Sequence, residues 1–220
     1  MEEKYLIVGG SKGIGSAVVN QLGEDKCIVI SRSDSGYTNQ ILCDVLTDDL
    51  PELENLKGLV YCPGSINLKP FHRLSEEDFI ADYKVNVLGA VRVLQYYFKA
   101  LKRNKGSVIL FGSVASKQGM AFHASIAAAK GGVEALARSL AAEWAPNIRV
   151  NTVNPSLTDT SLAEGLLNTE PKRENAAMRH PLKSIGSPHD IAKAAVFCLK
   201  NEWMTGQTVG IDGGLSTLRI

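Results

Sequence analysis

Short runs rich in β-branched residues alternate with helical patterns along the whole chain. The runs predict strands near residues 4–8, 26–30, 40–43, 57–62, 107–111, 148–153 and 207–211. Between them, apolar residues recur at helical spacing, as in the segments near 87–101 and 122–144. Parallel strands need such crossovers, because a tight turn can join only antiparallel strands. The sequence therefore predicts an α/β fold, a doubly wound parallel sheet of about seven strands with helices on both faces.

Composition limits the number of domains and the class of partner. The chain has 220 residues, 45% of them apolar, without a long linker, a repeat or a low-complexity tract, so we expect one domain over residues 1–220. Its 24 basic and 23 acidic side chains give a net charge of +1, which favours neither a nucleic-acid nor a membrane-surface partner. With no signal-peptide pattern, no apolar run of roughly 20 residues and no CxxC, the sequence predicts a cytoplasmic protein with reduced cysteines.

A glycine-rich segment, Gly9-Gly10-Ser11-Lys12-Gly13-Ile14-Gly15, follows the first predicted strand and precedes a helical stretch through Leu22. Glycine lets the backbone turn tightly and approach a pyrophosphate, whose charge the helix N-terminus stabilises. The alternative is an ordinary strand-to-helix turn. Because strand, turn and helix follow in the order that a phosphate loop requires, we predict a nucleotide site here.

From the G-x-x-x-G-x-G spacing of this loop onward, the chain resembles the short-chain dehydrogenase/reductase family. Matching segments follow in order: Asp44-Val45, Pro63-Gly64, Asn86-Val87-Leu88-Gly89, Gly112-Ser113, Arg149-Val150-Asn151, Pro155 to Thr160, Gly186-Ser187-Pro188, Thr205-Gly206-Gln207 and Asp212-Gly213-Gly214. Tyr61 and Cys62 replace two asparagines of the family pattern, and Ser156 replaces a glycine. The resemblance is greatest to the 3-oxoacyl-carrier-protein reductase-like branch, and it implies a Rossmann-like fold.

The resemblance also implies a nicotinamide cofactor. The residues that would bind it are Gly9, Ser11, Lys12, Gly13, Ile14, Gly15, Ser31, Arg32, Asp44, Val45, Pro63, Gly64, Lys130, Pro155, Ser156, Thr158 and Thr160. A site for NAD commonly has an acid at the end of the second strand, where this chain has Ser31-Arg32. Arg32 can bind a 2′-phosphate, and Lys12 adds a second positive charge. We therefore predict NADPH rather than NADH. The alternative is that both cations are solvated surface charges. The acid Asp34, two residues after Arg32, is the observation that favours NADH.

The catalytic residues implied by the resemblance are Ser113, Lys130 and Asn86. In the family, a tyrosine gives a proton to the carbonyl oxygen, the serine polarises that carbonyl, the lysine holds the nicotinamide ribose and the asparagine supports the lysine through water. Ile126 occupies the position of the tyrosine, thirteen residues after Ser113 and four before Lys130. An isoleucine cannot donate a proton.

His123 is the candidate replacement for the missing acid. It lies seven residues before Lys130, and the pair resembles the Tyr-x-x-Met-x-x-x-Lys spacing of the enoyl-reductase branch. Imidazole titrates near neutral pH and can act as a general acid. The alternative is that His123 only lines a pocket or caps a helix. Ser125 and Tyr61 are weaker candidates.

Two functions from different classes remain open. The first is an NADPH-dependent oxidoreductase that transfers hydride to a carbonyl, or to an activated enone, of a small organic substrate. The second is a cofactor-binding protein without turnover. Ile126 favours the second, whereas Asn86, Ser113 and Lys130 favour the first. The resemblance also implies a homodimer or homotetramer that pairs through the fourth and fifth predicted helices.

A polar segment, residues 157–185, is expected to cover the substrate pocket. Its apolar residues Leu162, Leu166, Leu167 and Met178 are expected to line that pocket. The remaining histidines, His72, His180 and His189, have no metal-ligand spacing, and we expect them at the surface or at helix caps.

The chain is short for the family it resembles, and the missing length can be placed. Eleven residues separate Arg32 from Asp44, and fourteen separate Asp44 from Leu59. A full crossover helix does not fit in either interval. We therefore expect shortened second and third crossovers beside the adenine end of the cofactor.

Overall fold

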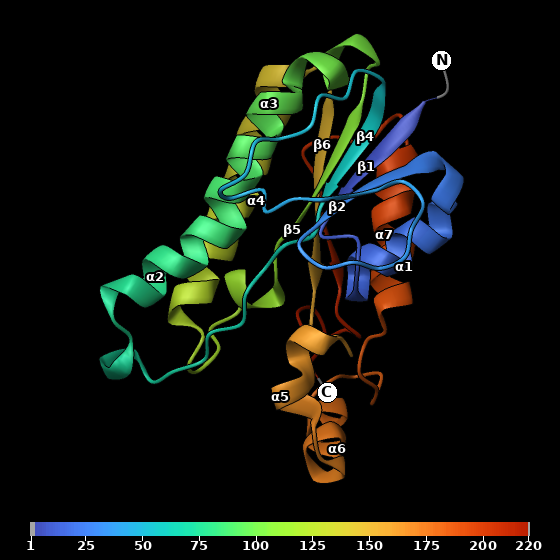
Figure 1. The fold of residues 1–220 in the computed structure, drawn as a ribbon. Coiled ribbons are helices and arrows are strands. Elements are labelled where there is room, and N and C mark those ends of the chain that lie inside the picture. The colour runs from blue at the N-terminus through green and yellow to red at the C-terminus, as the bar shows by residue number, and fades with distance from the viewer. Residues whose placement is uncertain (1–2, 220) are drawn as a thin grey trace.

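The computed structural model describes residues 3–219 and has seven parallel strands in one sheet, in the order β3-β2-β1-β4-β5-β6-β7 (Figure 1). The strands are β1 (Lys4–Val8), β2 (Cys27–Ser31), β3 (Gln40–Leu42), β4 (Leu56–Tyr61), β5 (Ser107–Phe111), β6 (Arg149–Pro155) and β7 (Thr208–Ile211). Every pair of neighbours is parallel. The predicted fold class is confirmed, and each predicted strand overlaps an observed one.

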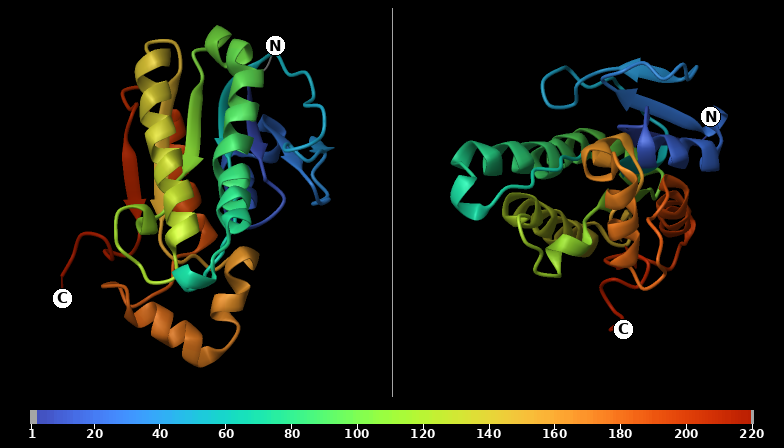
Figure 2. Two further views of the ribbon diagram at one scale, coloured as in Figure 1. Left: turned by 90° about the vertical axis from the view of Figure 1, so that its left-hand side faces the viewer. Right: turned by 90° about the horizontal axis from the view of Figure 1, so that it is seen from below.

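Helices cover both faces of the sheet. α1 (Gly13–Leu22) and α7 (Pro188–Lys200) lie on one face, and α3 (Gly89–Arg103) and α4 (Ala124–Trp144) lie on the other (Figures 1 and 2). α2 (Glu76–Tyr83) continues into α3 through the π-helical turn η3 (Lys84–Leu88). The 3-10 turns are η1 (Glu24–Lys26), η2 (Phe71–Arg73), η4 (Val114–Ser116) and η5 (Ser161–Ala163). The strand order reverses between β1 and β4, and open α/β sheets bind ligands at the carboxyl ends of strands beside such a reversal.

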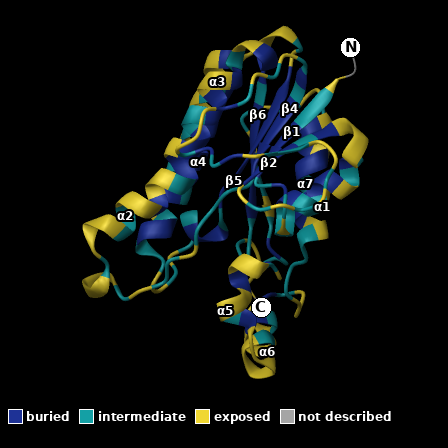
Figure 3. Cartoon of the chain, in the orientation of Figure 1, coloured by how far each residue is buried: buried dark blue, intermediate teal, exposed yellow. Residues whose placement is uncertain are grey.

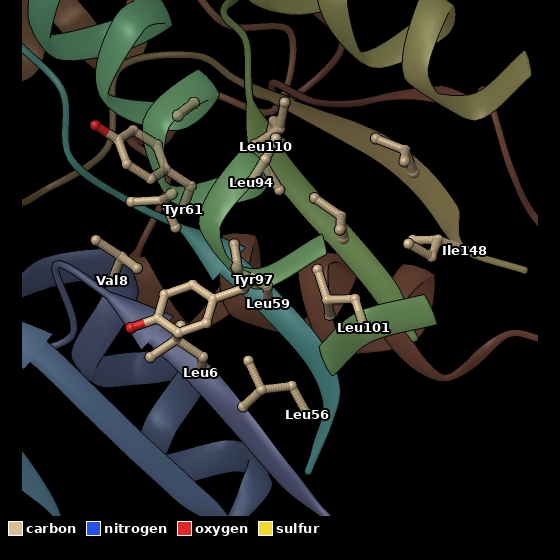
Figure 4. Packing of buried hydrophobic residues seen from close by; sticks show 14 of the residues in the cluster. Leu6, Val8, Leu56, Leu59, Tyr61, Leu94, Tyr97, Leu101, Leu110 and Ile148 are labelled. Carbon is tan, nitrogen blue, oxygen red and sulfur yellow. The ribbon is translucent and has the colours of Figure 1, made fainter. Parts of the chain in front are cut away.

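Two apolar layers attach the helices to the sheet. On the side of α3 and α4, Leu6, Leu59 and Leu110 of the strands are buried together with Leu94 and Tyr97 of α3 (Figure 4). The second layer, toward α1 and α7, contains the alternate residues of the same strands, because successive side chains of a strand point to opposite faces. Figure 3 shows the buried residues concentrated in the sheet and on the inner faces of the helices.

The second and third crossovers contain no helix, as the short sequence intervals predict. Residues 32–39 join β2 to β3, and residues 43–55 join β3 to β4. Side chains of α3 hold the longer loop. The Arg92 guanidinium donates to the carbonyl oxygens of Val45 and Asp48, both at 2.6 Å, and the Tyr97 hydroxyl donates to the Pro51 carbonyl at 2.8 Å. Fixed donors on α3 thus take the place of a crossover helix.

Residues 157–185 are more regular than their sequence predicts. They include η5, α5 (Glu164–Leu167) and α6 (Glu170–Met178), which project beyond the sheet in Figure 1. Ala163, Leu167 and Ala176 form a small buried cluster between these elements. Two of the four predicted pocket-lining residues therefore lie elsewhere: Leu167 is part of this cluster, and Met178 is 60% exposed.

All four cysteines have free thiols, and Cys27, Cys43 and Cys198 are buried, so the prediction of reduced cysteines fits the structure. Burial raises the pKa of the Cys27 thiol to about 12. Within residues 3–219, no helix has the length and the apolar content needed to cross a bilayer.

Arg149, the first residue of β6, attaches the end of α7 to the sheet. Its guanidinium donates to the carbonyl oxygens of Cys198 at 3.2 Å, Leu199 at 2.7 Å and Met204 at 3.2 Å. A helix leaves its last carbonyl groups without intrahelical donors. One side chain therefore satisfies three acceptors at and beyond the end of α7.

Replacing Arg149 with methionine removes these donors while keeping an unbranched apolar side chain. We expect R149M to lower the free energy of unfolding by about 2–4 kcal/mol, because each buried acceptor left without a donor costs about 1–3 kcal/mol. Urea denaturation measures this. The matched control is R103M: Arg103 is 63% exposed and 3.9 Å from Glu54, so its loss should cost less than about 0.5 kcal/mol. Equal effects would contradict the role given to Arg149.

Candidate active site

Two connected cavities open at the carboxyl ends of the strands. The larger, of about 510 Å³, is lined by residues of β5, β6, α4 and the covering segment 157–185. The smaller, of about 360 Å³, is lined by the glycine loop and the ends of β1, β2 and β4. Ile14, Cys62, Gly64, Thr160 and Leu162 line both cavities. The two therefore form one continuous site that suits an extended ligand.

With one exception, the site residues predicted from the sequence line these cavities. In the smaller cavity are Gly9, Ser11, Lys12, Gly13, Ile14, Gly15, Ser31, Arg32, Asp44, Val45, Pro63, Gly64 and Thr160, and in the larger are Ser113, His123, Lys130, Pro155, Ser156 and Thr158. The exception is Asn86, which is 1% exposed and lies behind the wall.

The glycine loop leaves space that side chains would fill. Gly9 has a φ of +76°, in the left-handed region that favours glycine. A Cβ at Gly15 would collide with the carbonyl oxygen of Gly9, so α1 begins directly against the loop. Thr160 of the covering segment lies 3.3 Å from the position of a Cβ at Gly13. The N-terminus of α1 borders the smaller cavity, and unpaired N–H groups there favour an anion.

Two cations border the smaller cavity. The Arg32 side chain is 78% exposed, and its guanidinium lies 3.8 Å from the Asp44 carboxylate. Lys12 is the exposed N-cap residue of α1. Ser31 has no free hydroxyl, because it donates to the Ser33 carbonyl at 3.0 Å and accepts from the Gln40 amide at 2.7 Å. A loop that only glycine fits, a helix N-terminus and two cations together fit the phosphates of a dinucleotide.

Lys130 lines the larger cavity next to Cys62 and Gly64, which line both cavities. Its Nζ donates to the carbonyl oxygen of Phe111 at 2.9 Å. Burial lowers the pKa of Lys130 to about 8, and the neighbouring Cys62 and Asp82 partly oppose this change. Burial also raises the pKa of the Cys62 thiol to about 12, although the lysine favours its ionised form.

Asn86 supports the floor of this junction. Its Nδ2 donates to the Ser65 hydroxyl at 2.9 Å and to the Asp82 carbonyl at 2.8 Å. Its Oδ1 is buried and has no partner. This oxygen and the Lys130 Nζ lie 3.4 Å and 3.6 Å from the position that a Cβ would take at Gly64. A buried acceptor without a donor, beside a lysine, marks a place for a hydroxyl group or a water molecule.

Ser113 follows β5 and lines the larger cavity. Its carbonyl oxygen accepts from the Asn154 amide at 3.2 Å, and the same amide donates to the Glu134 carboxylate at 2.6 Å. Glu134 lies one turn after Lys130 on α4. One buried carboxylate therefore connects the ends of β5 and β6 to the helix that contains the lysine.

His123, Ile126 and Lys130 follow one another at spacings of three and four residues, His123 just before α4 and the other two on it, and all three line the larger cavity. Ile126 is 6% exposed, so the wall is apolar where the family resemblance implies a tyrosine. The His123 Nδ1 donates to the Ala121 carbonyl at 2.7 Å, since a carbonyl can only accept. His123 is the N-cap residue of α4, and its carbonyl oxygen accepts from Ala127 N at 2.8 Å, but its side chain makes no capping bond.

The two weaker candidates for the acid do not reach the larger cavity. Tyr61 lines the smaller cavity, its hydroxyl donates to the Val85 carbonyl at 2.7 Å, and burial raises its pKa. Ser125 is 1% exposed and lines neither cavity.

His180 is buried, not at the surface or at a helix cap as its sequence position predicts. It is 2% exposed and lines the larger cavity. Its Nε2 lies 2.8 Å from the Ser156 Oγ, and its Nδ1 lies 2.9 Å from the Ala176 carbonyl oxygen. The prediction was wrong because Ser156 is 24 positions away in the sequence, and such a contact leaves no periodic pattern.

Two buried carboxylates have no counterpart among the sequence predictions. Glu134 is 5% exposed and Asp82 is 2% exposed. Glu134 could have been found as an acid on the apolar face of a predicted helix. Asp82, which accepts from the Ser65 hydroxyl at 2.5 Å, lies in the short helix α2 with three other acids, Glu76, Glu77 and Asp78, and gives no such indication.

The lowered pKa of Lys130 predicts how stability changes with pH. An unfolded lysine keeps its proton to about pH 10, whereas folded Lys130 loses it near pH 8. Between these values only the unfolded chain holds the proton, so the contribution of Lys130 to stability rises with pH. We expect the difference in free energy of unfolding between the parent and K130M to shift in favour of the parent from pH 7 to pH 10. The exposed Lys193 supplies the control K193M, for which the difference should stay level.

The comparisons with known proteins agree with this geometry. A family model described as "Enoyl-(Acyl carrier protein) reductase" matches residues 39–216. The chain is 30% identical to 3-oxoacyl-[acyl-carrier-protein] reductase MabA of Mycobacterium tuberculosis, over 98% of this chain and 93% of that protein. It is 31% identical to carbonyl reductase family member 4 of Danio rerio, over 99% of this chain and 100% of that protein. The structure of ElxO with NADP bound is similar in fold, with a TM-score of 0.87, 24% identity, and coverage of 99% of this chain and 100% of that one. The chain therefore belongs to the short-chain dehydrogenase/reductase family of oxidoreductases.

Proposed function

We propose that this protein is an NADPH-dependent reductase that transfers hydride to the carbonyl carbon of a small organic substrate. One observation carries the proposal: the two cavities meet beside Lys130, with a phosphate cradle on one side and Ser113 with an apolar wall on the other. A dinucleotide in the smaller cavity would reach this junction. The larger cavity would then hold the group that is reduced.

NADPH, when bound, supplies the hydride. The glycine loop and the N-terminus of α1 would bind its pyrophosphate. Arg32 and Lys12 would bind the 2′-phosphate as two cations at the edge of the smaller cavity. Among the described residues, Arg32 has one acidic partner, Asp44, and its side chain is 78% exposed, so it can reach a phosphate. Lys130 would hold the nicotinamide ribose, and the unpartnered Asn86 Oδ1 beside it would accept from a hydroxyl or a water molecule.

The residues of the larger cavity would complete the reaction. Ser113 would donate its hydroxyl to the carbonyl oxygen and polarise it. His123 would supply the proton as an imidazolium, from Nε2, because its Nδ1 is bonded to the Ala121 carbonyl. General acid catalysis contributes about 10²–10⁴ in rate, so a donor other than the missing tyrosine matters.

The substrate-side wall favours an apolar carbonyl compound. Leu157, Leu162 and Leu166 of the covering segment line the cavity. Lys172 of α6 and Arg179, which follows α6, also line it. The names of the relatives include 3-oxoacyl and carbonyl substrates, and the family model is named for an enoyl reductase. A ketone is therefore the first candidate, and an activated enone is the second.

We also propose that two or four copies assemble through α3 and α4. Leu88, just before α3, is 50% exposed, and Tyr96 of α3 is 47% exposed. These apolar side chains would be covered by a second copy.

Steady-state oxidation of NADPH against a panel of ketones, aldehydes and enones tests the activity. We expect turnover by the parent, and a higher kcat for I126Y, because the new phenol lies at the cavity wall four residues before Lys130. The increase could reach about 10²-fold. H123A should lower the kcat of the parent more than it lowers that of I126Y.

A128Y is the matched control, because Ala128 is exposed and lines neither cavity. NADPH binding without turnover in the parent and in I126Y would favour the alternative of a cofactor-binding protein without turnover.

The cofactor assignment has its own test in R32A. We expect about tenfold weaker binding of NADPH and unchanged binding of NADH, because hydrogen bonds to charged groups contribute about 1.5–3 kcal/mol and Asp44 offsets part of this. Fluorescence titration of both nucleotides measures it, with R103A as the control. Equal dissociation constants of the parent for NADPH and NADH would overturn the assignment.

A further inference from the structure

Ser156 and His180 form a buried pair on the wall of the larger cavity. The His180 Nδ1 lies 2.9 Å from the Ala176 carbonyl oxygen, and a carbonyl can only accept, so Nδ1 holds a proton. In the neutral ring, Nε2 is then an acceptor, and the Ser156 hydroxyl donates to it across 2.8 Å. In the imidazolium, Nε2 donates to the Ser156 Oγ instead. The charge on His180 therefore decides whether the Ser156 hydroxyl proton is free to point into the cavity.

The pair lies next to Ser113. β5 and β6 are parallel neighbours with Phe111 opposite Val153, and Ser113 and Pro155 each follow two residues later in the sequence. The Asn154 amide bonds to the Ser113 carbonyl at 3.2 Å, which fixes the two strand ends to each other. Ser113 and Ser156 thus follow adjacent strands, and neighbouring strands of a sheet lie about 5 Å apart. Both serines line the cavity that Lys130 also lines.

We propose that Ser156 donates the proton to the reduced carbonyl oxygen and that His180 resupplies it, by a route independent of His123. This inference rests on the proposed reductase function. Ser156 is the catalytic residue, since it lines the cavity that would hold the reacting group. His180 is a positioning residue that acts through Ser156.

The step balances in atoms and charge. The carbonyl carbon would accept the hydride that NADPH supplies and form a C–H bond, and the π electrons of the C=O bond would move to oxygen. That oxygen takes the Ser156 hydroxyl proton as Ser156 takes the Nε2 proton of the imidazolium. The products are an alcohol, oxidised cofactor and neutral His180, which regains a proton from solvent.

The charged side chains around His180 are mainly cations. Arg179 and Lys172 of α6 and its end, with Lys130 of α4, line the same cavity, and Lys183 follows in the next turn. Gly213 packs against the imidazole, with the position of a Cβ 3.3 Å from the His180 Cβ. The adjacent Asp212 carboxylate accepts from Gly214 N at 2.9 Å and from Ser216 N at 3.2 Å. The acid nearest in sequence to this contact is therefore already bonded.

The pH dependence of kcat distinguishes this route from a structural histidine. We expect S156A and H180Q each to lower kcat at least tenfold, and H180Q to leave the Kd for NADPH within twofold. The glutamine of H180Q can still bond to Ser156, but it does not titrate. In the H123A background, which lacks the other titratable donor, adding H180Q should therefore flatten the alkaline fall in kcat, whereas H123A alone should retain it. S125A, a buried serine outside both cavities, and H72Q, which changes an exposed histidine, are the matched controls.

A second measurement does not depend on turnover. In ¹⁵N spectra of the NADP-loaded protein recorded over a range of pH, we expect signals of the His180 imidazolium, with a proton on Nε2, and we expect S156A to change the Nε2 chemical shift. A ring that stays neutral over that range would overturn the proposal, because it has no proton at Nε2 to give. So would S156A and H180Q that retain the kcat and the pH profile of the parent. If no carbonyl is reduced by the parent, the proposed reductase function fails instead, whatever the titration shows.

Discussion

The geometry of the candidate active site depends on one buried carboxylate. Glu134 of α4 accepts from the Asn154 amide at 2.6 Å and from the Ser116 hydroxyl. Its other oxygen lies 3.9 Å from the guanidinium of Arg138, which is exposed. A buried carboxylate is stable only when its oxygens are bonded, so the ends of β5 and β6 must stay where these donors are. Lys130, one turn away on the same helix, is then held at a fixed position relative to both strand ends.

Most of the fold could be predicted, because its elements follow from local patterns. Each strand is a short β-branched run, and α3 and α4 have apolar residues at helical spacing. The absence of helices in the second and third crossovers followed from counting residues between Arg32, Asp44 and Leu59. The support for the loop 43–55 could not be predicted, since Arg92 and Tyr97 of α3 bond to carbonyl groups more than 40 positions earlier. Long-range contacts of this kind have no periodicity.

The candidate site could be predicted where its residues belong to motifs. The glycine loop, Ser113 and Lys130 lie at the carboxyl ends of strands or on the helix beside them, where the order of elements places them. The covering segment could not be predicted in the same way, because α5 and α6 are short and polar. Its inner face depends on how Ala163, Leu167 and Ala176 pack together. The sequence therefore predicts His180 at the surface or at a helix cap, although it is buried against Ser156.

The replacement of a tyrosine by Ile126 changes which parts of the molecule can supply a proton. His123, the N-cap residue of α4, is a titratable side chain that lines the same cavity as Lys130. The other polar pair joins two elements, since Ser156 follows β6 and His180 follows α6. Arg173 of α6 is paired with Asp159, and the Ala163 cluster packs beneath it, so these contacts keep His180 beside Ser156. A tyrosine on α4 would be in place whatever the covering segment does. A proton that passes from His180 to Ser156 instead requires α6 to be packed over the cavity, which couples the chemistry to closure of the pocket.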